Sequence, residues 1–121
     1  MMRVVTGAVL ACVAGLALAQ EDAVDIGTGV VLRGLDKVNA NVTDIDLQSG
    51  QSTEYGRLTV SLGECRYPVG DPAADAFAFL TITDTASGDE VFSGWMVASS
   101  PAINALEHPR YDVWVLRCKT G

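Results

Sequence analysis

Residues 58–65 read Leu-Thr-Val-Ser-Leu-Gly-Glu-Cys. Every second residue from Leu58 to Leu62 is apolar, and the residues between them carry hydroxyl groups, which is typical of a half-buried β-strand. Gly63 then breaks the alternation just before Cys65, so we expect a β-bulge that re-aims the cysteine. This stretch therefore predicts one strand of a β domain, with a local irregularity at the cysteine.

Segments of the same character, rich in Val, Thr, Leu and aromatic residues, flank this strand on both sides. Short runs of Gly, Asn, Asp and Pro separate them, which is the pattern of an all-β domain. We expect these strands at Val30 to Lys37, Val42 to Leu47, Phe77 to Thr83, Val91 to Ala98 and Tyr111 to Cys118. The predicted fold is a small antiparallel sandwich or barrel of six to seven strands.

Local features of these strands and turns can also be predicted. Alternation in the last strand places Trp114, Leu116 and Cys118 on one face, with Cys118 pointing inward. Residues 38–41 are expected to form a turn, because Asn tolerates left-handed backbone angles. Residues 85–89 are expected to form a hairpin loop with a glycine where a positive φ is needed.

One short helical insert is expected before the last strand, at about residues 100–107. A serine cap precedes Pro101, which occupies the first helical position. Ile103 and Leu106 supply an apolar face, and Pro109 ends the helix because the residue before a proline is pushed out of the helical region.

The first nineteen residues have the three-part pattern of a secretory signal peptide. Arg3 supplies a positive charge, Val4 to Leu18 form an apolar run, and Ala17-Leu18-Ala19 offers small residues for cleavage. The run of about 15 residues is shorter than the ~20 that span a bilayer as a helix. We therefore expect a periplasmic mature chain that starts at Gln20 and has no transmembrane span.

A competing interpretation of the same region is a lipoprotein, because Val9 to Cys12 loosely resembles a lipobox. The apolar run before Cys12 would then be only about eight residues, which is short for a signal. A retained, uncleaved anchor is the third alternative. The expected organisation is a signal peptide at 1–19, a flexible lead-in at 20–29 and a single β domain at 30–119.

The overall composition excludes several classes of protein. Fifteen acidic residues against eight Lys and Arg give a net charge of −7. This excess argues against nucleic acid as the main partner and against a basic patch held to anionic lipid. With 49% hydrophobic and 19% charged residues, the chain also lacks the composition of a disordered protein.

The cysteines predict one disulfide bond. Cys12 leaves with the signal peptide, so Cys65 and Cys118 remain as an even pair in an exported chain. The alternative is a redox-active or metal-binding pair, but neither cysteine lies in a C-x-x-C spacing.

The segment between the two tryptophans is densest in polar and aromatic side chains and is our candidate interaction surface. Its members are Trp95, Ser99, Ser100, Asn104, Glu107, His108 and Tyr111. Exposed Trp and Tyr often anchor partners in protein interfaces. The competing interpretation is that the large aromatic residues belong to the core, where they supply much of a small domain's buried area.

Two chemical alternatives use the same segment. The first is a nucleophile–base–acid set made of Ser99 or Ser100, His108 and Asp112. No G-x-S-x-G elbow surrounds either serine, however, and capping a helix explains both. The second is a metal site at Glu107, His108 and Asp112, but a lone histidine with acids at this spacing is a weak signal. We therefore expect no catalytic residue, no metal and no cofactor.

Four motifs in this segment carry a family resemblance. They are Gly94-Trp95-Met96, Ser99-Ser100-Pro101, Leu106-Glu107-His108-Pro109 and Tyr111-Asp112-Val113-Trp114. The chain resembles an uncharacterised bacterial family of exported proteins, a domain of unknown function. The resemblance implies an exported β domain with two cysteines, and it implies no activity and no site residues.

These observations together favour a non-catalytic envelope protein of the periplasm. It would bind another envelope protein or a cell-wall or outer-membrane component. The alternative is a small periplasmic hydrolase or ligand-binding accessory that uses Ser99 or Ser100 with His108. A purely structural or inhibitory domain is the third interpretation.

Overall fold

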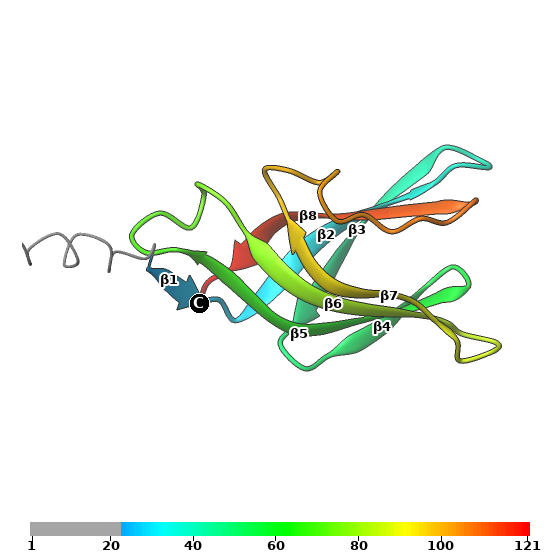
Figure 1. Cartoon of the computed structure of the whole chain (residues 1–121), viewed down its shortest axis with the longest axis horizontal. Helices are drawn as coiled ribbons and strands as arrows, with labels where there is room; N and C mark the ends of the chain where they lie inside the picture. The colour runs from blue at the N-terminus through cyan, green and yellow to red at the C-terminus, as the bar shows by residue number, and fades with distance from the viewer. Residues whose placement is uncertain (1–22) are drawn as a thin grey trace, which may run out of the picture.

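The alternating stretch at Leu58 to Leu62 forms part of a long central strand. The computed structural model describes residues 23–121. Strand β5 (Leu58–Pro68) contains the stretch, with its Leu and Val side chains buried and its hydroxyl residues half-buried. Within the described residues there are seven further strands and no helix. They are β1 (Val24–Ile26), β2 (Gly29–Asp36), β3 (Asn41–Gln48), β4 (Ser52–Tyr55), β6 (Phe77–Asp84), β7 (Glu90–Val97) and β8 (Tyr111–Lys119) (Figure 1).

The strands form two antiparallel sheets that share one hydrophobic core. In the first sheet β5 pairs with β1 and β4 on one side and with β6 on the other, and β7 pairs with β6. The second sheet has the order β3-β2-β8. Fully buried side chains from both sheets meet in a single cluster, among them Leu32, Leu47, Leu58, Leu80 and Ile82.

The prediction of an all-β, antiparallel chain is confirmed, and the strand count is higher than expected. The described part of the chain has eight strands instead of six or seven because β1 and β4 add short partners to β5. Residues 23–29 of the predicted lead-in include β1, and residues 20–22 and the predicted signal peptide at 1–19 lie outside the described residues.

The disulfide and the bulge beside it are confirmed. Cys65 on β5 and Cys118 on β8 are bonded, with their Cα atoms 5.6 Å apart. The register of β5 against β6 shifts between Leu62 and Cys65, where Gly63 interrupts the alternation. Because β5 and β8 belong to different sheets, the disulfide links the two sheets across the core.

The prediction that Trp114, Leu116 and Cys118 share one face of the last strand is wrong. Val113, Val115 and Cys118 are buried, whereas Trp114 and Leu116 are only half-buried. The cause is a second register shift, because Val31 and Leu32 pair with Arg117 and Val115 and leave Leu116 without a partner in β2. This bulge reverses the alternation, so Cys118 points inward with the opposite set of residues.

The prediction of a short helical insert at about residues 100–107 is also wrong. The segment that joins β7 to β8, residues 98–110, contains turns and bends and no helix. We call this segment the connecting loop. The serine before Pro101 caps no helix, and the hydroxyl of the neighbouring Ser99 donates to Asp75 at 2.7 Å. Ile103, expected on the buried face, is 74% exposed.

Both predicted turns form, with one difference in residue. Gly88 has a positive φ of 77° in the 85–89 loop, as expected. In the turn after β2 the positive φ of 63° falls on Ala40 and not on an asparagine. Asn39 instead accepts a hydrogen bond from the Asn41 N–H at 2.9 Å.

Candidate interaction surface

The start of the connecting loop is held by Asp75 and Ala76, the two residues that precede β6. Asp75 accepts hydrogen bonds from the Ser99 N–H at 3.0 Å and from the Ser99 hydroxyl at 2.7 Å. Ala98 N–H donates to the Ala76 carbonyl at 2.9 Å. The Ser99 hydroxyl, one of the two candidate nucleophiles, thus makes a structural hydrogen bond.

The middle of the loop covers the outer edge of β7. Asn104 Nδ2 donates to the Trp95 carbonyl at 2.9 Å, and Ser100 N–H donates to the Val97 carbonyl at 3.2 Å. A Cβ on Gly94 would lie 2.8 Å from Asn104 Nδ2, so glycine is needed for this approach. These bonds occupy backbone acceptors that an edge strand would otherwise leave open to another chain.

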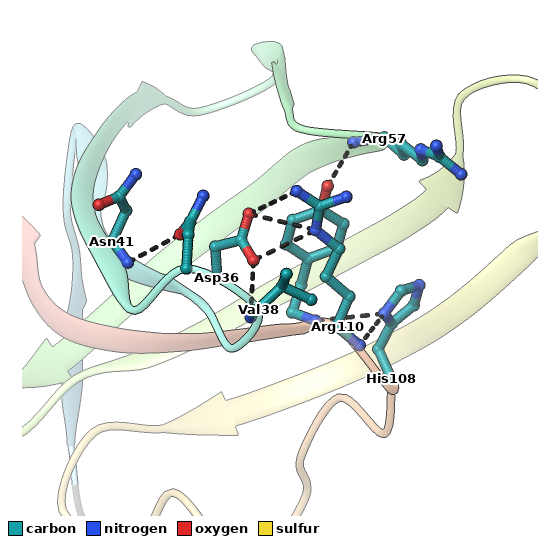
Figure 2. Close-up of polar contacts among 8 residues, drawn as sticks. Asp36, Val38, Asn41, Arg57, His108 and Arg110 are labelled. Atoms are coloured by element: carbon teal, nitrogen blue, oxygen red, sulfur yellow. Dashed lines mark hydrogen bonds and ion pairs between the residues drawn. The ribbon is translucent and has the colours of Figure 1, made fainter.

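The end of the loop is held through His108, as Figure 2 shows. His108 Nδ1 accepts hydrogen bonds from the Arg110 N–H at 3.0 Å and the Tyr111 N–H at 3.2 Å. Lys37 Nζ donates to the His108 carbonyl at 2.7 Å. Because a backbone N–H can only donate, Nδ1 is the acceptor in both of the bonds to Arg110 and Tyr111.

An ion pair between Arg110 and the largely buried Asp36 completes the anchor (Figure 2). Arg110 Nη2 lies 2.9 Å from Asp36 Oδ2, and Nε lies 3.2 Å from both carboxylate oxygens. Val38 N–H also donates to this carboxylate at 3.0 Å. The hydrogen bonds from Arg110 lower the pKa of Asp36, although burial opposes them, and the same pair raises the pKa of Arg110.

Tyr111 lies beneath the loop and is 2% exposed. Its hydroxyl accepts a hydrogen bond from the Arg57 N–H at 3.3 Å, and its ring meets Tyr55 edge-on at 5.4 Å between centroids. A Cβ on Gly56, which has a φ of 58°, would lie 2.3 Å from the Tyr111 hydroxyl oxygen. Burial raises the pKa of Tyr55, and the Asp36 charge adds to this effect.

The structure therefore brings most of the candidate residues onto one loop. Asn104 and Glu107 are exposed on it, His108 and Ser100 are half-buried, and Tyr111 supports it from inside.

Three side chains of the hypothetical catalytic set, those of Ser99, His108 and Asp112, make contacts with groups outside the set. The Ser99 hydroxyl pairs with Asp75, and His108 Nδ1 accepts two backbone N–H groups. Asp112 lies 3.5 Å from Lys37 Nζ. The described residues also contain no group of three or more His, Cys, Asp or Glu side chains arranged to hold a metal ion.

Trp95 is the candidate residue with the most distinctive surroundings. It lies on the outer face of β7 and is 36% exposed. Its ring meets Phe79 edge-on at 5.4 Å, and the Arg66 guanidinium lies 4.8 Å from its centroid. Arg66 also forms an ion pair with Glu64.

A groove of about 270 Å³ opens beside this stack. It is lined by Val24, Arg66, Phe77 and Trp95, and we call it the aromatic groove. Of these four lining residues, only Trp95 was identified from the sequence. One signal was available, because β6 is apolar on both faces, which leaves Phe77 and Phe79 outside the core.

A comparison with family models matches residues 30–118 of the chain to the family described as "Uncharacterized protein conserved in bacteria (DUF2155)". An uncharacterized protein of Rickettsia prowazekii (strain Madrid E) is 29% identical over 87 residues. That match covers 69% of this chain and 56% of the relative, so the chain spans little more than half of the relative's length. No solved structure matches the chain. Among residues 23–121 no helix is long and apolar enough to cross a membrane.

Proposed function

Because the chain belongs to the DUF2155 family of uncharacterized bacterial proteins, we propose that it is a non-catalytic, exported binding domain of the cell envelope. Its partner is another envelope protein or a cell-wall or outer-membrane component. The observation that carries this proposal is the aromatic groove.

The composition of the aromatic groove supports binding. Tryptophan and arginine are enriched among the residues that dominate binding energy in protein interfaces. Here Phe79 and Arg66 fix the ring of Trp95 from two sides, so little side-chain entropy is lost when a partner covers it. Val24, which is 41% exposed, adds an apolar side chain to the lining of the groove.

Export is supported by the sequence pattern of residues 1–19 and by the disulfide. A buried bond between Cys65 and Cys118 suits an oxidising compartment. The intact mass of protein taken from the envelope tests this part of the proposal. We expect a chain that starts at Gln20 with both remaining cysteines protected from alkylation. A chain that retains residues 1–19, or two free thiols, would contradict it.

Binding is tested by crosslinked capture of the tagged protein from intact cells. We expect Trp95→Ala to lose the captured component, because it removes the ring that forms one wall of the groove. Val42→Ala is the matched control, since Val42 is an exposed apolar residue on β3 and lies outside the groove. The same capture by both variants would refute a role for the aromatic groove.

A further inference from the structure

Strand β8 forms a free edge of its sheet within residues 23–121. It pairs with β2 on one side, and no described strand pairs with it on the other. The backbone groups of successive residues in a strand point to alternate edges. The Arg110 carbonyl accepts from the Lys37 N–H at 2.8 Å on the β2 side, whereas the Tyr111 N–H turns the opposite way to His108 Nδ1. Val113 and Val115 follow Tyr111 with a period of two, so their N–H and C=O groups also point to the free edge.

A groove of about 320 Å³ runs between the connecting loop and this edge. Ala102, Ala105 and Leu106 line it from the loop, and Val113 and Trp114 line it from β8. The lining is mostly apolar. Leu106 is 5% exposed, so the wall that the loop contributes is held by the core. The His108 and Arg110 contacts described above fix the loop beyond Leu106, and the groove is thus formed before any partner arrives.

The lining of this groove includes one acidic side chain. Asp112 is the only ionisable residue among the described residues that line it. Its contact with Lys37 spans 3.5 Å between side chains that are about 40% exposed, and a surface pair of this kind is weak. The whole chain carries a net charge of −7, which favours a cationic partner.

We propose that the β8 edge binds an extended, basic peptide segment by strand addition. The peptide backbone pairs with the N–H and C=O groups of Val113 and Val115. One apolar side chain enters the groove, and a Lys or Arg side chain lies beside Asp112. In this mode the backbone bonds supply affinity and the pockets for alternate side chains supply specificity. The site uses other residues than the aromatic groove, and it does not depend on the function proposed above.

The probe is a capped heptapeptide of alternating lysine and valine, added to the mature, oxidised protein. Amide hydrogen exchange followed by NMR is the readout. At a peptide concentration tenfold above its Kd, exchange at Val113 and Val115 is expected to slow about tenfold, because binding protects only the occupied state. Two further versions of the peptide carry N-methyl groups, one on the odd-numbered and one on the even-numbered residues. Only the version that blocks the N–H groups facing β8 should lose binding. Protection at β3, the other edge of this sheet, without protection at β8 would overturn the proposal.

Three variants test the charge argument and the location of the site. Asp112→Asn is expected to weaken the lysine peptide about two- to fivefold, the effect of one exposed ion pair. Asp25→Asn, the same change on β1, should leave the affinity unaltered, and so should Trp95→Ala. Equal binding of a peptide of alternating glutamate and valine would refute the basic partner. No binding of the lysine peptide at millimolar concentration would refute strand addition itself.

Discussion

The disulfide between Cys65 and Cys118 gives the most quantitative prediction. The two cysteines are 53 residues apart in the chain, and their bond links one sheet to the other. In the chain-entropy model, opening a loop of this length releases about 4 kcal/mol of constraint on the unfolded state. A domain of about 100 residues shifts its Tm by several degrees per kcal/mol, so we expect reduction to lower Tm by about 20 °C.

The assay is thermal and urea unfolding of the protein, first oxidised and then reduced. The reduced protein keeps both sulfur atoms in the core, so the difference reports mainly the loss of the crosslink. Its m-value should rise, because an unlinked unfolded chain exposes more surface. The double variant Cys65→Ala with Cys118→Ala should lose a further ~1 to 2 kcal/mol, because both residues are buried and the change leaves a cavity. A loss below about 1 kcal/mol on reduction would show that the crosslink is not what holds the sheets together.

Three further predictions concern the turn after β2, the connecting loop and its ion pair. Ala40→Gly should stabilise the protein by up to about 1 kcal/mol in urea unfolding, because Ala40 has a φ of 63° and glycine adopts this conformation freely; a loss of stability would contradict this. Asn104→Ala should cost about 1 kcal/mol in the same assay, since the Trp95 carbonyl loses its donor, and no change would show that water replaces the amide. The pKa of Asp36 is lowered by Arg110, so the stability from this pair is present above the unfolded pKa near 3.8 and is lost as the pH falls below it. Arg110→Leu should therefore lose less stability than the native protein between pH 5 and pH 2, and parallel pH profiles would refute the assignment.

The sequence predicted the parts of the fold that depend on local pattern. The six longer strands, the bulge before Cys65 and the glycine in the 85–89 loop all follow from alternation and from turn residues a few positions apart. Strands β1 and β4 contain only three and four residues, too few for alternation to be recognised. They pair with the edge of β5 that lies opposite β6, a contact that local sequence does not reveal.

The errors arose where distant contacts decide local structure. The connecting loop has a cap-like serine and a well-placed proline, but Ser99 bonds to Asp75, 24 residues earlier in the chain. The reversed alternation at Leu116 depends on how β8 pairs with β2, about 85 residues away. Neither pairing can be read from neighbouring residues.

The same holds for the candidate site. Trp95, Asn104 and His108 were identified because unusual residues gather in one segment. Arg66 was missed because its contact with Trp95 joins β5 to β7 across β6, and because the bulge before Cys65 changes the face that Arg66 occupies.

The aromatic groove is the surface that we propose binds a component of the envelope. A photo-crosslinking amino acid placed at Phe77 in living cells tests it most directly, with the same substitution at Val42 as the control. We expect a defined covalent adduct from position 77 and none from position 42. The same adducts from both positions, or none from position 77 while the protein is present in the envelope, would contradict it.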